Sequence, residues 1–196
     1  MKKPKVKKNV SQLKNENTGE DPVFSTKTWH LAQTEVEDKL SNFELLLWRL
    51  FYSFLRWQED CQSCVSDDDV TAHEIALMHL IRIRERPKSL YEIARVMNRD
   101  DMPNLQYSLK KLLKLNIIKK SKKSAQKTIF YEIAERGIRI TDKYSAIRRD
   151  ILKKRLANFK DQDWEQISEI LAEYKSMYDE ASRVASLLRT DENILK

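Results

Sequence analysis

The chain contains few of the residues that interrupt helices. Its 196 residues include only two glycines and four prolines. A chain with so few helix breakers and so many Leu, Ile, Lys and Glu residues is expected to form long helices. It also lacks an apolar run long enough to cross a membrane, and its N-terminus lacks the apolar core of a signal peptide. We therefore expect a mostly α-helical protein of the cytoplasm that does not enter the membrane.

Cysteine is also scarce, which excludes a disulfide-rich secreted domain. The two cysteines, Cys61 and Cys64, have C-x-x-C spacing. A zinc site would need two more ligands, and His73 and His79 are not placed to supply them, so we expect no metal and no other cofactor. Two interpretations stay open for the pair: a redox switch, because cytosolic C-x-x-C thiols can be reactive, or two inert cysteines at the end of a helix.

Motifs of catalytic sites are missing as well. The sequence has no glycine-rich phosphate loop and no nucleophile motif, and its carboxylates follow no pairing pattern. The sequence therefore does not predict an enzyme.

Acidic residues are absent from one long segment. Between Met102 and Tyr131 there is no Asp and no Glu, although acids are nearly as common as bases in the whole chain. The segment carries eight lysines: Lys110, Lys111, Lys114, Lys119, Lys120, Lys122, Lys123 and Lys127. A charge run is often only a solvated face. The length of this acid-free segment, in a chain whose net charge is +7, favours a surface that binds nucleic acid.

Two helix starts precede the acid-free segment. Thr71 with Glu74, and Ser89 with Glu92, have the spacing of a capping box, in which each side chain satisfies a free backbone amide. The second helix is expected to end near Met97 in a polar turn. Two short helices joined by a tight turn are typical of a helix-turn-helix.

The acid-free segment itself changes from a helical to a strand-like pattern. Residues 104–116 read as a helix, and residues 117–120 and 128–134 read as two strands around a lysine-bearing turn. The inward face of the helix carries Leu105, Leu109, Leu112 and Leu113. The sequence thus predicts a winged helix-turn-helix with a small β-hairpin wing.

The outward face of this helix is predicted to bind DNA. Residues near the N-terminus of a recognition helix reach base edges. Asparagine and glutamine pair with adenine, tyrosine packs on thymine methyls or bonds phosphate, and lysines contact phosphates. The predicted DNA-binding residues are Ser89, Pro103, Asn104, Gln106, Tyr107, Lys110, Lys111, Lys122, Lys123 and Lys127. An ordinary polar helix face is the alternative.

Long amphipathic helices are predicted on both sides of this region. Apolar residues recur every three or four positions over 28–62, and those over 167–188 come close to a coiled-coil seam. A helix is also expected to follow Gly137 and to end near Lys160. Because too few core residues lie between the ends to cover these helices, we expect a homodimer. The predicted division is a disordered basic tail over 1–25, an N-terminal dimerisation helix over 26–65, the winged helix-turn-helix over 66–136 and C-terminal dimerisation helices over 137–196.

The order of these elements resembles the MarR family of bacterial transcription regulators. The resemblance covers roughly residues 28–188 and is best over 89–98, over 109–118 and at Ala134-Glu135-Arg136-Gly137, where the family often has Leu-Thr-Glu-Lys-Gly. It implies a two-fold dimer joined by its terminal helices, with a winged helix-turn-helix in each subunit. The partner implied is double-stranded DNA with a pseudo-palindromic operator. The family often has a pocket for a small-molecule effector between the two regions.

Two segments depart from the family pattern. The family's wing often carries Asp-x-Arg, whose arginine enters the minor groove, whereas this chain has Ala125-Gln126-Lys127. Lys127 fits a narrow groove less well than arginine, so we expect a less selective wing. The loop over 98–104 is also unusual and resembles a subgroup from alphaproteobacteria linked to cell-envelope and stress genes.

The function expected from the sequence is that of a dimeric, sequence-specific transcription regulator, a repressor under the control of a small-molecule effector. The alternative is a winged-helix interaction module that binds an acidic protein through the same basic face.

Overall fold

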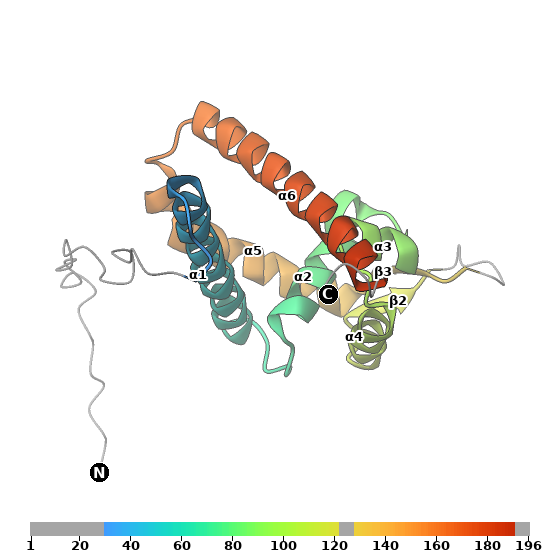
Figure 1. The fold of residues 1–196 in the computed structure, drawn as a ribbon. Coiled ribbons are helices and arrows are strands. Elements are labelled where there is room, and N and C mark those ends of the chain that lie inside the picture. The colour runs from blue at the N-terminus through green and yellow to red at the C-terminus, as the bar shows by residue number, and fades with distance from the viewer. Residues whose placement is uncertain (1–29, 122–127, 191–196) are drawn as a thin grey trace, which may run out of the picture. The chain divides into compact units, whose positions relative to one another are not determined.

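The computed structural model describes residues 30–121 and 128–190. In chain order the elements are α1 (Glu35–Ser63), α2 (Ala72–Arg82), the 3-10 helix η3 (Ile83–Glu85), β1 (Lys88–Ser89), α3 (Leu90–Val96), α4 (Met102–Lys114), β2 (Ile118–Lys120), β3 (Phe130–Ile133), α5 (Glu135–Leu156) and α6 (Asp161–Thr190) (Figure 1). The predicted class, mostly α with a winged helix-turn-helix between long helices, is confirmed. Within the described ranges no helix is both long and apolar enough to span a lipid bilayer.

The chain divides into two compact units between Trp57 and Gln58. The first unit contains most of α1, and the second contains the end of α1 and every later element. The sequence analysis placed boundaries between residues 65 and 66 and between residues 136 and 137, where the expected role of the chain changes. These boundaries differ from the division into compact units and stay predictions.

The helix α1 begins with a capping box that the sequence interpretation missed. The Glu37 amide donates to Thr34 Oγ1 at 3.3 Å, and the Thr34 amide donates to the Glu37 carboxylate at 2.8 Å. Residues 30 to 34 are not helical. The helix therefore starts at Glu35, later than the expected start near residue 28, because these side chains satisfy the first free amides there.

The winged-helix region packs α2, α3 and α4 against a three-stranded antiparallel sheet of order β1-β3-β2. Ser89 lies opposite Phe130, and Ile118 lies opposite Ile133. The hairpin was predicted, but β1 was not, because two residues are too few to show an alternating pattern. The largest fully buried apolar side chains are Ile75, Leu77, Met78, Ile81, Ile93, Leu105, Leu109, Leu112, Ile117 and Ile118. The inward face predicted for α4 is thus confirmed for three leucines, while Leu113 is half-buried.

The end of α2 is held by a buried lysine. Arg84 adopts the left-handed conformation, with φ 61°, so the chain turns sharply after the helix. Lys88 Nζ donates to the carbonyl oxygens of Ile81 at 2.9 Å and Arg86 at 3.1 Å, and also to that of Ile83. Burial lowers the pKa of Lys88. The ammonium group thus hydrogen-bonds carbonyl oxygens at the end of α2 and in the turn that follows it.

The start of α5 differs from the prediction. The helix begins at Glu135, so Gly137 lies inside it, and it ends at Leu156 rather than near Lys160. A Cβ atom on Gly137 would lie 2.2 Å from the carbonyl oxygen of Ile117 and 2.6 Å from Cδ1 of Ile133. The glycine is therefore required by the close approach of α5 to the base of the hairpin, not by a turn before the helix.

Candidate nucleic-acid interface

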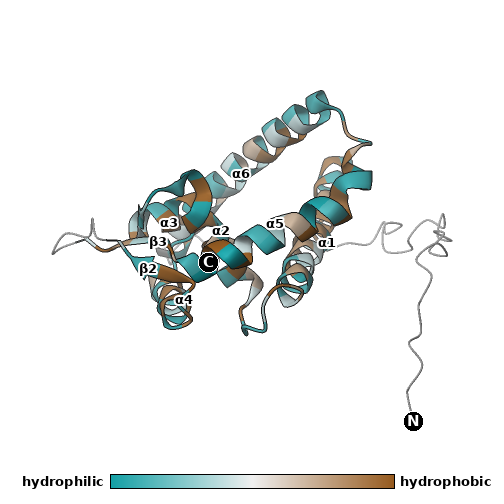
Figure 2. Ribbon diagram, turned by 180° about the vertical axis from the view of Figure 1, so that it is seen from behind, coloured by the Kyte–Doolittle hydropathy of each residue, from teal (hydrophilic) through white to brown (hydrophobic). Residues whose placement is uncertain are grey.

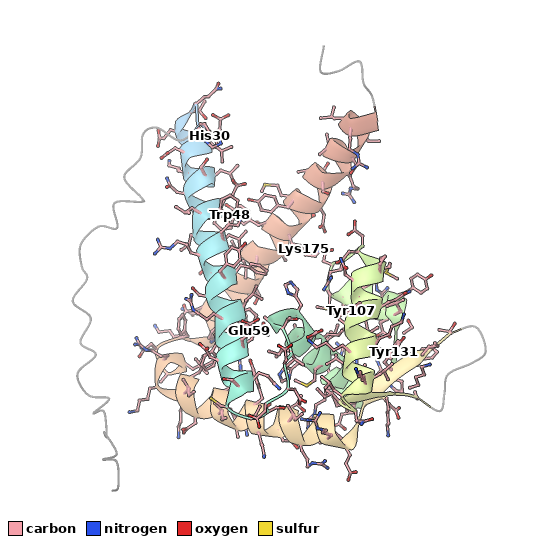
Figure 3. All side chains as sticks on the ribbon, turned by 90° about the horizontal axis from the view of Figure 1, so that it is seen from below. His30, Trp48, Glu59, Tyr107, Tyr131 and Lys175 are labelled. Atoms are coloured by element: carbon pink, nitrogen blue, oxygen red, sulfur yellow. The ribbon has the colours of Figure 1, made fainter. Side chains whose placement is uncertain are left out.

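The helix α4 exposes one narrow stripe of side chains. Tyr107 is 71% exposed, and Lys110 and Lys114 are exposed three and seven residues further along. Because residues three and four apart share a helix face, the three side chains project together, opposite the buried leucines. Pro103 lies in the first turn of α4. Figure 3 labels Tyr107 on this helix.

A surface hollow of about 340 Å³ lies where α3, α4 and β3 meet. Its lining residues are Ser89, Leu90, Tyr91, Gln106, Lys110, Thr128, Ile129 and Tyr131. The structure thus brings three of the predicted DNA-binding residues, Ser89, Gln106 and Lys110, to one place. None of the lining residues is acidic, and one is a lysine. The hollow can therefore accept an anionic group beside a hydrogen-bonding amide and an aromatic ring.

Ser89 fixes the start of α3 beside this hollow. Its Oγ accepts from the Glu92 amide at 3.2 Å. The predicted capping box is only half formed, because the Glu92 carboxylate binds Arg86 Nη1 at 3.0 Å rather than the Ser89 amide. The hydrogen bond from Arg86 holds the pKa of Glu92 below its ordinary value. Glu92 is thus neutralised by an arginine at the edge of the candidate interface.

Lys111 does not belong to this exposed stripe, although the sequence predicted it on the DNA-binding face. Its Nζ is 2.9 Å from Glu74 Oε2 and 4.0 Å from Asp69 Oδ2. The Glu74 side chain is only 4% exposed, and it also accepts from the Thr71 amide in the confirmed capping box of α2. The hydrogen bond to Glu74 raises the pKa of Lys111. Lys111 therefore fastens α4 to the first turn of α2.

Asn104 is part of a charged network at the start of α4. Its Nδ2 donates to Asp101 Oδ2 at 3.3 Å. Arg99 holds the same carboxylate through two nitrogens, one of them at 2.7 Å, and this lowers the pKa of Asp101 to about 2. The carboxylate thus stays charged but is neutralised by Arg99. Asn104 is thus held by Asp101 through one Nδ2 hydrogen, while its second hydrogen and its Oδ1 keep their own bonding capacity.

The sequence interpretation missed Tyr91. This side chain is 77% exposed and lines the hollow next to Gln106 and Lys110. The signal was present, because the apolar Ile93 takes the buried side of α3 and lies two residues from Tyr91, which therefore points to another side of the helix. The predicted wing contacts Lys122, Lys123 and Lys127 lie outside the described residues.

The two cysteines are free and lie in different environments. Cys61 is buried, and burial raises the pKa of its thiol, which keeps it protonated and unreactive. Cys64 is exposed, and its thiol donates to the Asp60 carbonyl oxygen at 3.3 Å. Across 30–121 and 128–190, no group of three or more His, Cys, Asp or Glu side chains is placed to hold a metal ion. Of the two cysteines, only Cys64 is open to an oxidant.

A second polar cluster is buried at the end of α1. Gln58 is 6% exposed and Gln62 is 2% exposed. Gln58 Oε1, both amide atoms of Gln62 and His79 Nε2 have no hydrogen-bond partner within the described residues. The His79 ring lies 4.5 Å from that of Tyr144, and burial, with two nearby arginines, lowers the pKa of His79 to about 4. His79 is therefore neutral at pH 7, and four polar atoms of these three side chains lack a hydrogen-bond partner within the described residues.

Comparison with known proteins extends the description of the fold. Residues 70–137 match the family described as winged helix DNA-binding domain. A search of curated proteins finds no match. Among solved structures, Streptococcus pneumoniae FabT in complex with DNA is 10% identical, with a TM-score of 0.57 over 72% of this chain and 99% of that one.

Two other DNA complexes are similar to the chain. A MarR mutant from E. coli complexed with operator DNA is 13% identical, with a TM-score of 0.56 over 72% of this chain and 99% of that one. The S. aureus MepR–DNA complex is 14% identical, with a TM-score of 0.51 over 68% of this chain and 96% of that one. The chain therefore has the winged-helix fold of MarR-family regulators, with a DNA-binding type of winged helix over residues 70–137, which confirms at the level of the fold the resemblance seen in the sequence.

Proposed function

We propose that the protein is a dimeric, sequence-specific DNA-binding regulator of transcription that acts in the cytoplasm. The observation that carries this proposal is the exposed stripe of α4, Tyr107, Lys110 and Lys114, beside a hollow without acidic residues. The match over residues 70–137 supports it, as do the DNA complexes of FabT, MarR and MepR, which share the fold.

The predicted residues of the interface have the following proposed roles. Tyr107 and Gln106 contact base edges, while Lys110 and the Ser89 hydroxyl contact phosphates. Pro103 fixes the first turn of α4, and Asn104 reads a base. The wing lysines Lys122, Lys123 and Lys127 are proposed to contact phosphates or the minor groove. Lys111 contributes by holding α4 on α2.

Two neighbouring lysines test this proposal as a matched pair. Genomic footprinting first identifies the operator, and salt titrations then measure the affinity of each variant. Lys110→Ala should weaken binding to operator and random DNA alike and reduce the slope of log affinity against log salt by up to about 1.8, because a dimer presents each phosphate contact twice. Lys111→Ala removes the same charge but should mainly lower the melting temperature, because the buried Glu74 carboxylate loses its cationic partner.

Sequence reading is tested separately. Gln106→Ala should cost on the order of 1–3 kcal/mol on the operator and much less on random DNA. A wild-type protein that prefers no DNA sequence would overturn the proposal. Binding to an acidic protein instead would favour the interaction module.

Exposed apolar side chains support the dimer. On α6, five residues of the predicted seam are 40–50% exposed: Ile167, Ile170, Met177, Val184 and Leu188. The unit that contains most of α1 exposes Trp48 and Phe54 by 56% and 53%. So many large apolar side chains exposed along one helix are rare on monomers. Sedimentation at micromolar concentration should therefore show a dimer.

We also propose that the dimer represses its target genes under the control of a small-molecule effector. The buried polar atoms of Gln58, Gln62 and His79 that have no hydrogen-bond partner within the described residues support an effector site with complementary donors and acceptors. Deletion of the gene should raise expression from a reporter that carries the operator. An effector should raise the melting temperature of the wild type and leave that of Gln62→Leu unchanged.

A further inference from the structure

The linker between α1 and α2, residues 64–71, is held at its centre by an arginine of α5. Figure 2 shows this linker as the loop from the end of α1 to the start of α2. Arg136 Nη2 donates to both carboxylate oxygens of Asp68, at 2.9 and 2.8 Å. The Asp68 side chain is only 10% exposed and also accepts from the Ser66 hydroxyl. Burial alone would raise the pKa of Asp68, but the hydrogen bonds from Ser66 and Arg136 hold it below its ordinary value.

The same guanidinium group reaches the recognition helix. Arg136 Nη1 donates to the carbonyl oxygen of Leu115 at 2.6 Å, and Leu115 is the C-cap of α4. Carbonyl groups at the end of a helix lack an amide partner within the helix, and positive charge is favourable there. We call this contact of Asp68, Arg136 and Leu115 the linker clamp, because it joins the linker, the first turn of α5 and the end of α4.

Lys111 strengthens the clamp from the side of α4. It lies one turn before Leu115 and binds Glu74 in the first turn of α2 at 2.9 Å. Both contacts therefore hold the C-terminal half of α4. The residues proposed to read bases, Gln106 and Tyr107, lie in the other half of the same helix. Because a helix moves as a rigid unit, the place of these side chains in a DNA groove depends on how the C-terminal half is held.

The other end of the linker begins at the buried polar cluster. The carbonyl oxygen of Gln62 accepts from the amides of Val65 at 2.9 Å and Ser66 at 3.0 Å. The Gln62 side chain is 2% exposed, and both of its amide atoms lack a partner within the described residues. A continuous series of contacts thus leads from this cluster through the linker to the end of α4.

We propose that Arg136 is a positioning residue for the recognition helix, and that the linker clamp couples the cluster around Gln62 to operator binding. This inference rests on the proposed function and names how the DNA-binding face is regulated. A ligand that moves the end of α1 shifts Asp68, and Arg136 carries the shift to α4. Phosphate contacts position the protein on DNA, whereas base contacts depend on where the side chains of α4 lie. The clamp should therefore act on sequence preference.

Arg136→Gln tests this role, with Arg139→Gln as the matched control. Arg139 lies three residues later on α5 and lines the same surface hollow of about 410 Å³ beside the linker. It is exposed and has no hydrogen bond or ion pair with any side chain or carbonyl group within the described residues. The two substitutions remove the same charge from the same region, but only the first breaks the clamp.

Salt titrations on operator and random DNA give the readout. Arg136→Gln should lower the ratio of operator affinity to random-DNA affinity by roughly tenfold. The slope of log affinity against log salt should stay that of the wild type, because the guanidinium group holds protein groups and not phosphate. Arg136→Lys keeps the charge but lacks the planar fork that reaches both partners, so it should behave like Arg136→Gln. Arg139→Gln should keep the operator preference of the wild type.

Hydrogen exchange gives a second test that leaves the arginine in place. In the wild type, operator binding should slow exchange of the Val65 and Ser66 amides, because DNA fixes α4 and the clamp fixes the linker on it. Asp68→Asn keeps the size of the side chain but removes the charge that binds Arg136, so the operator should slow these amides much less. Arg139→Gln should follow the wild type. Circular dichroism confirms that each variant is folded.

Four outcomes would overturn the inference. If Arg136→Gln keeps the operator preference, its contacts do not position α4. If it weakens operator and random DNA alike and flattens the salt slope, Arg136 binds a phosphate itself. If Arg139→Gln lowers the operator preference equally, the charge of α5 rather than the clamp decides. If the operator leaves exchange in the wild-type linker unchanged, the linker is not coupled to α4. A wild type that prefers no DNA sequence would instead overturn the proposed function.

Discussion

At the scale of single residues, Lys88 is a buried charge with a structural task. Replacing it with Met removes the ammonium donor to three carbonyl oxygens at the end of α2 and in the turn that follows, which should lower the free energy of unfolding by on the order of 2–4 kcal/mol. Lys119→Met is the control, because this lysine is exposed and pairs with Glu132 at 3.3 Å. Exposed pairs contribute little, about 0–1 kcal/mol. Urea unfolding of both variants measures the difference, and equal losses would contradict the role of Lys88.

His79 should make the stability depend on pH. Its pKa in the folded chain is about 4, against 6.5 without burial, so the unfolded chain binds the proton first as the pH falls. The stabilising contribution is therefore complete above pH 6.5 and is lost as the pH falls toward 4. The shift corresponds to on the order of 3 kcal/mol.

A pair of variants isolates this effect. His79→Phe keeps a ring against Tyr144 but cannot take up a proton, so its free energy of unfolding should fall less than that of the wild type over this range. His73→Phe, at an exposed position of the same helix, should follow the wild type. The measurement is chemical denaturation at several pH values, and parallel curves for all three proteins would exclude His79 as the titrating group.

At the scale of elements, α6 is fastened to the helix-turn-helix. Asn98, in the left-handed conformation at the turn after α3, donates to Asp179 Oδ1 on α6 at 3.0 Å. Asn98→Gly keeps that backbone conformation and loses the hydrogen bond, and Asp179→Ala loses it from the other side. Each variant should increase amide hydrogen exchange in α6 around Asp179.

The double variant decides whether the two residues act through one bond. Amide hydrogen exchange in α6 should be only slightly faster in the double variant than in either single variant, because the effects of substituting two residues in direct contact are not additive. Fully additive effects would mean that the residues stabilise α6 independently of each other.

At the scale of the whole molecule, the proposed dimer sets the geometry of its operator. Two recognition helices related by a two-fold axis read half-sites about one helical turn, roughly 10 bp, apart. Inserting about half a turn between the half-sites rotates one of them to the far side of the duplex, so tight binding should be lost. An insertion of a full turn is the control for spacing alone. Fluorescence anisotropy measures each affinity, and unchanged binding after the half-turn insertion would exclude this docking.

The sequence by itself determined the winged helix-turn-helix. The spacing of Leu105, Leu109 and Leu112, the capping box of Thr71 with Glu74 and the alternation of the hairpin are local signals. A few consecutive residues carry each of them, whatever the rest of the chain does. The lysine-rich, acid-free segment is also a property of composition, so the candidate interface could be located before its geometry was known.

Only the tertiary structure decided which partners these residues have. Lys111 reaches Glu74, and Gly137 touches Ile117, because α4 and α5 cross elements that are distant in the sequence. The same holds for β1, whose two residues become a strand only because β3 lies beside them. The periodicity of a helix gives the side on which a residue lies, but not what it meets there. The partner depends on how the helices and the sheet pack. Packing brings together residues that are far apart in the sequence, and no local sequence pattern indicates which of them will meet.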